Sequence, residues 1–466
     1  MRFIHWTFAF CLFTASFDLL LVLHIGGSLR LAQVLVMVVG LGAVARIMQD
    51  GRILWPRGCT ALLLWTLLQL WFVMFSGNVP LALQFFALLL AIMSSIFILP
   101  QIYGLSDHIE SLMRVYCASF VAVGAYGILQ FCSPALFHVT LPLTVQWFVH
   151  GRIPRVNGFS YEPSYYATYM LLGWVMLVDL KATGSQLAQS RLVRYGIPIT
   201  TIAMILCSSR VGWVVMLLQL FSRQVPKVTA FLRRARKDIP QGRLIFKIPT
   251  RRRLVVLIAG LLLMLGAVAG AVAVLPSMDI LLAGTGINGT AAHSLDDRSE
   301  RMQATWEVFL ASPLVGRSLG GVPVAIGALK GLEVTNIDGV RAYWGYPVLL
   351  ELLVASGIIG FIPFLLFLWS ITFGALRVSK ARIADERAKW LHALAKAMIF
   401  EWIVLMNDPN SLRLYLWFHF AIVVVVRYHL ENAPALATSP KTQGYAVASP
   451  ALLSASVTTI AEAGSV

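Results

Sequence analysis

The sequence RVNGFSYEPSYYATYM, from Arg155 to Met170, places charged, aromatic and hydroxyl side chains at the start of an apolar run. Glu162 stands directly before Pro163. A residue before proline avoids helical backbone, and proline itself fits the first turn of a helix. The pattern therefore predicts Glu162 at the end of an apolar helix. There it either accepts a proton from a reacting hydroxyl or pairs with Arg155 and the helix N-terminus, and the sequence leaves both interpretations open.

Three tyrosines, Tyr161, Tyr165 and Tyr166, flank this glutamate. Tyrosine rings can stack on the faces of sugars, but they also anchor helices at a membrane interface, and interfacial anchoring is the commoner reason for this pattern. Tyr161 and Tyr165 are kept as candidate binding residues beside Glu162.

Arginines outside the densely basic segments form a second group of candidates. A guanidinium presents a fixed fork of donors that matches a phosphate, and it stays charged at any relevant pH. The alternative is a set of local ion pairs with Asp296, Asp297 or Glu300. These arginines are Arg152, Arg155, Arg210, Arg298, Arg301, Arg317 and Arg341.

The composition identifies the kind of molecule that positions these side chains. Of 466 residues, 58% are hydrophobic and 12% charged, with a mean hydropathy of +0.78. Long apolar runs recur along most of the chain, which indicates an all-α polytopic membrane protein. The net charge of +16 is distributed over short segments between these runs, as in cytoplasmic loops, so it argues against nucleic-acid binding. The five cysteines form no CxxC pair, which argues against a zinc site or a disulfide framework.

About twelve membrane spans are predicted. Two of them, 194–207 and 211–222, are shorter than the roughly 20 residues that a full crossing needs, and they flank CSSRVGW with Arg210 between them. The predicted spans are 4–23, 29–48, 59–76, 80–99, 112–133, 163–180, 194–207, 211–222, 254–275, 347–370, 390–406 and 412–427.

We assign residues 1–430 to a transmembrane bundle. The distribution of positive charge between its spans predicts how the bundle is oriented in the membrane. The basic segment 223–253 predicts a cytoplasmic loop, and the loop charges then place both termini inside. The segments 134–162 and 276–346 become external loops, the second with helical character at 299–310. The tail 431–466 is rich in Ala, Ser, Thr and Pro and is predicted to be disordered.

Three further residues lie on or next to the second external loop. His293 lies in a Gly/Thr/Ala stretch, where it is either solvated or within reach of an acceptor hydroxyl. Tyr346 and Glu351 follow at the start of the next span.

Three motifs in this order resemble the O-antigen ligase/polymerase family of bacterial envelope enzymes. They are SSR at 208–210, DDRSERMQATWEVFLASPLVGRSLGG from 296, and YPVLLELLVASGIIGFIPF from 346. The resemblance covers roughly 151–364. One departure matters: Tyr346 and Pro347 stand where the ligase branch has a histidine and a small polar residue, which favours a polymerase.

The resemblance implies a membrane-embedded glycosyltransferase of GT-C-like fold in the bacterial inner membrane, with its active site facing the periplasm. Such an enzyme moves a growing glycan from undecaprenyl diphosphate onto a new lipid-linked repeat unit, without metal or cofactor. Arg210, Arg298 and Arg301 would hold the departing diphosphate, with Glu162 as base. Arg155 and Arg152 would assist in binding. A chain-length regulator and a flippase are the implied protein partners.

Two other functions remain open. A ligase would transfer the finished glycan to a lipid or protein acceptor. A polysaccharide or lipid transporter would need a polar pathway near mid-membrane and usually repeated halves, and the sequence offers neither.

Overall fold

The fold is that of a computed structural model, which describes residues 2–24, 28–149, 153–224, 291–336, 340, 343–406 and 412–432. The molecule is mostly helical (75%) and has almost no strand, as the composition predicts. The predicted span 254–275 lies outside the described residues, as do most of the basic loop and nearly all of the tail.

A helix lies at each predicted span inside the described part of the chain. The α-helices are α1 (Arg2–Thr14), α2 (Leu31–Asp50), α3 (Cys59–Phe72), α4 (Val79–Tyr103), α5 (Ile109–Phe137), α6 (Pro163–Ala182), α7 (Arg191–Leu206), α8 (Arg210–Ser222), α12 (Ala291–Ala311), α13 (Gly321–Leu329), α15 (Val348–Trp369), α16 (Ala375–Ala381), α17 (Glu386–Leu405) and α18 (Leu414–Glu431). Short 3-10 turns are η1 (Val73–Phe75) and η2 (Gln186–Gln189), and a π-helical turn, η4 (Ser370–Gly374), joins α15 to α16.

Within the described residues, five helical segments are long and apolar enough to cross a membrane: Leu31–Asp50, Val79–Tyr103, Ile109–Pro134, Val348–Ala381 and Leu414–Glu431. Two shorter apolar segments, Cys59–Phe75 and Arg210–Ser222, accompany them. The length and composition of these helices indicate insertion into a membrane. The count of about twelve spans stays a prediction.

The first predicted span, 4–23, is wrong in its extent, because α1 ends at Thr14. The chain turns there and enters the antiparallel hairpin of β1 (Val22–His24) and β2 (Ser28–Arg30), in which Leu23 lies opposite Leu29. Asp18 lies in the turn, where its carboxylate forms ion pairs with two arginines. A continuous helix would have carried this carboxylate along the span instead.

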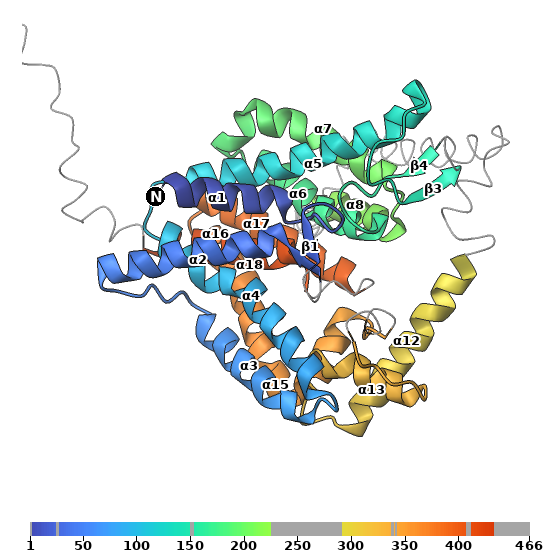
Figure 1. Cartoon of the computed structure of the whole chain (residues 1–466). Helices are drawn as coiled ribbons and strands as arrows, with labels where there is room; N and C mark the ends of the chain where they lie inside the picture. Colours follow the sequence, from blue (N-terminus) through green and yellow to red (C-terminus); the bar gives the residue numbers. More distant parts are fainter. Residues whose placement is uncertain are drawn as a thin grey trace, which may run out of the picture.

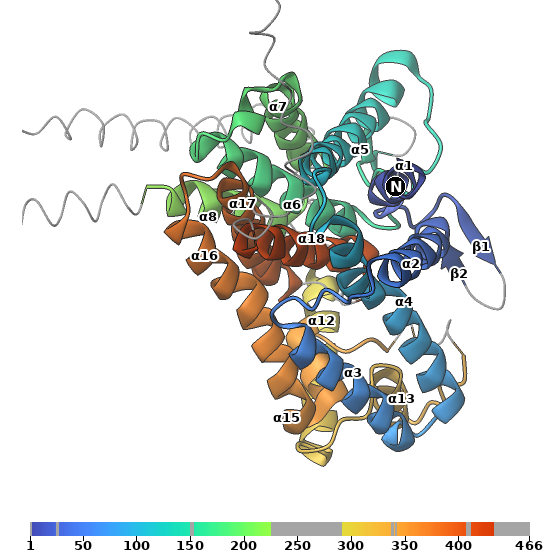
Figure 2. The ribbon, with the colours of Figure 1, turned by 90° about the vertical axis from the view of Figure 1, so that its left-hand side faces the viewer.

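Helix α18 forms the centre of the bundle (Figures 1 and 2). Nearly all its side chains are buried, as expected for a helix that is apolar on every side. It packs against α4, α16 and α17. In both views α5 and α7 lie on one side of α18, and α3, α13 and α15 lie on the other.

A buried polar chain joins α18 to α5 and α17. His419 Nε2 lies 3.0 Å from the Leu394 carbonyl oxygen, and this carbonyl can only accept. Nε2 therefore carries the proton, so Nδ1 accepts from the Tyr116 hydroxyl at 2.8 Å. These bonds satisfy a histidine that would otherwise be costly to bury.

Helix α15 is broken at Gly357, where φ is 57° and ψ is 177°. The segment 313–318 docks against this break and replaces the missing helical hydrogen bonds. The amides of Ile358 and Ile359 donate to the carbonyls of Pro313 and Leu314, at 2.9 and 3.4 Å. On the other side of the break, Arg317 and Ser318 donate to the carbonyls of Val354 and Ala355, at 3.2 and 2.9 Å. The second and third sequence motifs therefore meet as one structural unit.

Two polar side chains of α3 complete this unit. Trp65 Nε1 donates to Ser356 Oγ at 2.9 Å, and Gln69 Nε2 donates to the same oxygen at 2.7 Å. Broken backbone at membrane depth is tolerated only where protein or a water-filled cavity satisfies it, and here protein does so.

We expect Gly357→Ala to destabilise the protein by about 3 kcal/mol or more, because glycine alone readily adopts this backbone conformation and an added Cβ would overlap the Leu314 carbonyl. Thermal unfolding in detergent measures the loss. Gly184→Ala is the matched control, since Gly184 has a φ of 66° but nothing within 4 Å of an added Cβ. The loss of unfolding free energy in this control should be about 1 kcal/mol. Equal losses in the two variants would contradict the role of docking at Gly357.

Candidate functional site

Glu162 lies at the start of α6, as the sequence predicts. Its backbone is extended (φ −131°, ψ 149°), and Pro163 is the first helical residue. The carboxylate is half-buried and accepts a hydrogen bond from the Ser164 hydroxyl at 3.1 Å. It makes no capping bond to the helix backbone. Its charge is therefore directed toward neighbouring side chains.

Arg155 is the nearest of these neighbours along the chain, on strand β4 (Ile153–Arg155), which pairs with β3 (Gln146–Val149). Its Nη1 donates to Gln146 Oε1 at 3.2 Å, while its buried Nε has no hydrogen-bond partner among the described residues. Burial lowers the pKa of Arg155. The nearby Cys207 and Glu162 raise this pKa, and the charge of Arg210 lowers it. Arg155 therefore feels the charges of both Glu162 and Arg210.

Arg210 is the first residue of α8. Ser209 caps this helix by accepting from the Gly212 amide at 3.3 Å, and Ser208 turns the chain with a φ of 52°. The predicted break between two short helices is thus confirmed, and it leaves the Arg210 side chain exposed at a helix N-terminus. Positive side-chain charge at a helix N-terminus favours an anion at this position.

A buried carboxylate holds the FSYEPS segment in place. Asp18 Oδ1 lies 2.8 Å from Arg30 Nη2, and Oδ2 lies 2.5 Å from Arg413 Nη1. The Asp18 amide donates to the Phe159 carbonyl at 3.0 Å, and the Tyr161 amide donates back to Oδ2 at 3.3 Å. This cluster ties the start of α18 and the β1–β2 hairpin to the residues just before Glu162.

The tyrosines divide according to their surroundings. Arg413 lies over the ring of Tyr165, with its guanidinium carbon 3.8 Å from the ring centroid, a cation–π contact. Tyr161 is 53% exposed and remains open to a ligand, whereas Tyr166 is fully buried against α5. Although burial alone would lower the pKa of Arg413, Asp18 and Tyr165 raise it above its ordinary value. Arg413 therefore stays charged.

The sequence analysis did not select Arg413. The signal was nevertheless present: this arginine directly precedes the apolar run that begins at Leu414, on the side predicted to be external. The reasoning that selected Arg155 applies to it equally.

Arg298 and Arg301 lie on α12, which packs on α13 and α15. The predicted helical character of 299–310 is confirmed by this helix. Arg301 pairs with Asp297 one turn earlier, at 3.1 Å, as the local-pair alternative predicts. Arg298 makes no ion pair within the part of the chain that the structure describes. These two arginines thus form a group separate in sequence and packing from Arg155 and Arg210.

Tyr346 and Glu351 belong to the α12 group. The Tyr346 amide donates to Thr305 Oγ1 at 3.0 Å, so the backbone at Tyr346 is bonded to α12. Glu351 is fully buried on α15, against Gly345. Tyr346 is therefore tied to the helix that carries Arg298 and Arg301.

Three other candidates are not described. Arg152 and Arg341 lie outside the described residues, and so does the side chain of His293. Within the described ranges, no three His, Cys, Asp or Glu side chains are grouped as metal ligands would be.

No model of a known protein family and no curated protein matches this chain. The fold and the site define only a class of protein. It is a helical protein with membrane-length apolar helices and an arginine-bearing site at the N-terminal ends of α6 and α8.

We expect Asp18→Asn to destabilise the protein by about 3 kcal/mol, since removing one partner leaves buried arginine charge uncompensated. Thermal unfolding in detergent measures the loss. Asp50→Asn is the control, because Asp50 pairs with Arg46 at 3.2 Å on an exposed helix face, where a pair contributes about 0.5 kcal/mol. If both variants unfold at the same temperature, Asp18 does not hold the segment.

Proposed function

We propose that this protein is a glycosyltransferase that extends a polysaccharide from lipid-diphosphate-linked oligosaccharides at the external face of a bacterial inner membrane. One observation carries the proposal: Arg155, whose buried Nε has no hydrogen-bond partner among the described residues, comes together with Glu162 and Arg210 from three different elements. The arrangement supplies cations for a diphosphate beside a carboxylate that can accept a proton.

In the proposed reaction, a hydroxyl oxygen of the acceptor sugar attacks the anomeric carbon of the donor glycan. The bond between that carbon and the diphosphate oxygen breaks, and the diphosphate leaves with the electron pair. Glu162 takes the proton of the attacking hydroxyl. Arg155 and Arg210 stabilise the charge that grows on the leaving oxygen. The reaction needs no metal on this account, because diphosphate is already a good leaving group.

The α12 group has a second role in this proposal. Arg298 and Arg301 lie on a helix fixed to the broken helix α15, on the same side of the molecule as the β3–β4 hairpin (Figure 1). The two groups would contact different parts of the lipid-linked substrates. Tyr161, being exposed, offers a ring for a sugar face.

Replacing Arg210 or Arg298 by alanine should abolish chain extension while protein levels stay near wild type. Loss of one charge-matched donor lowers a rate by about 10²–10³. Glycan length on polysaccharide gels is the readout. Arg→Lys should rescue poorly, since lysine cannot make the bidentate contact. The control is Arg114→Ala, because Arg114 pairs with Glu110 on an exposed face of α5. Wild-type glycan length in Arg210→Ala and Arg298→Ala would refute the assignment.

Deletion of the gene separates the polymerase from the ligase alternative. Loss of a polymerase leaves single repeat units on the carrier or the cell surface. Loss of a ligase leaves long glycans on the carrier.

The proposal requires the 276–346 segment to face outside. A cysteine introduced at Leu332, which is 50% exposed, should react with a membrane-impermeant maleimide on intact cells. A cysteine at Arg52, exposed on the side predicted to be cytoplasmic, should react only after permeabilisation. The reverse pattern would place the proposed site in the cytosol and eliminate it.

A further inference from the structure

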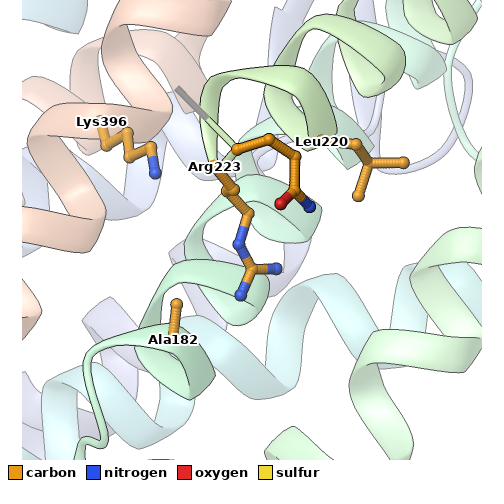
Figure 3. A pocket seen from close by; sticks show the side chains of 5 residues that line it. Ala182, Leu220, Arg223 and Lys396 are labelled. Carbon is orange, nitrogen blue, oxygen red and sulfur yellow. The ribbon is translucent and has the colours of Figure 1, made fainter. Parts of the chain in front are cut away.

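A cavity of about 460 Å³ opens at the C-terminal ends of α6 and α8, against α17. Its lining comprises Ala182, Leu220, Arg223, Gln224 and Lys396. In Figure 3 the side chains of Arg223 and Lys396 extend into the space between these helices. By the positive-inside reasoning, this end of the bundle faces the cytoplasm. The site is therefore distinct from the one around Glu162, which lies at the opposite end of α6.

The charges around this cavity leave a cation in excess. Lys396 Nζ lies 2.7 Å from Asp179 Oδ1, and Asp179 is 2% exposed, so these two charges balance each other. Arg223 has no ion pair or hydrogen bond to its side chain within the described ranges. None of the described residues that line the cavity is a carboxylate. A guanidinium in this setting favours an anionic ligand with phosphate geometry.

A second cavity of about 700 Å³ lies on the other side of the same helix end. Its described lining residues are Lys181, Ala188, Gln189, Val193, Arg194 and Ile197, and none of these is a carboxylate. Lys181 and Ala182 are consecutive, so the two cavities flank the end of α6. Helix C-termini carry negative partial charge, so any anion here must be bound by basic side chains rather than by backbone amides.

An exposed apolar row leads to Arg223 along α8. Val214, Leu217 and Leu220 stand three residues apart, so each neighbours the next on the helix surface, and they are 54%, 42% and 46% exposed. Arg223 follows Leu220 at the same spacing, and both residues line the cavity. A molecule with a phosphate at one end and a hydrocarbon chain at the other matches both features, whereas free phosphate matches only the first.

We infer that the first cavity binds the headgroup of an anionic phospholipid from the cytoplasmic leaflet. The phosphate contacts Arg223, and an acyl chain lies along Leu220, Leu217 and Val214. Basic cavities between helices on the cytoplasmic side are suited to such headgroups. The site goes beyond the proposed glycosyltransferase function and does not depend on it.

The test uses the full chain in nanodiscs of mixed phosphatidylcholine and phosphatidylglycerol, with bound lipid counted by native mass spectrometry after release into detergent. Wild type should retain phosphatidylglycerol, and Arg223→Gln should bind it about fivefold more weakly. Arg223→Lys should retain part of the affinity. Arg57→Gln is the matched control: Arg57 faces the same side, its side chain is 74% exposed, and it lies 3.6 Å from Glu431.

Leu217→Ser provides a second variant that leaves the charge in place, and it should also lower retention because it interrupts the exposed row. The inference fails if both variants retain phosphatidylglycerol as wild type does, or if phosphatidylcholine is retained equally. It also fails if inorganic phosphate displaces the lipid completely, since the row along α8 would then contribute nothing.

Discussion

The ion pairs of the Asp18 carboxylate are the interaction on which the Glu162 end of the bundle depends. It pairs with Arg30 and Arg413 and accepts from the Tyr161 amide, so it joins an N-terminal hairpin, the last helix and the FSYEPS segment. A buried charge is tolerated only when it is paired and hydrogen-bonded, and Asp18 meets both conditions. Because the cluster fixes the backbone next to Glu162, the orientation of the candidate site follows from it.

The break in α15 solves a different problem on the other side of α18. Gly357 interrupts the helix, and the segment 313–318 supplies and accepts the hydrogen bonds that the helix lacks there. The same docking fixes α15 behind α12, the helix that carries Arg298 and Arg301. A loop motif and a span motif, read separately in the sequence, are thus two halves of one structure.

Positive charge is used differently at the two ends of α6. At the Glu162 end, Arg155, Arg210 and Arg413 each have a carboxylate, a ring or a helix N-terminus nearby. At the Ala182 end, Lys181, Arg194 and Arg223 line two cavities whose described lining residues include no carboxylate. The first arrangement fixes the geometry of the segment before α6. The second leaves basic side chains available to an anionic ligand.

The sequence alone determined the helical class, a helix at each predicted span within the described residues, the short pair around Arg210 and the extended backbone of Glu162. These depend on local composition and on Pro163, which act within a few residues. Only the tertiary structure decided that α1 ends before Asp18, that Asp18 pairs with Arg413, and that Arg413 covers Tyr165. Partners such as Asp18 and Arg413 are far apart along the chain, so hydropathy and spacing carry no information about which charges meet; folding chooses the partners because a buried charge must find one.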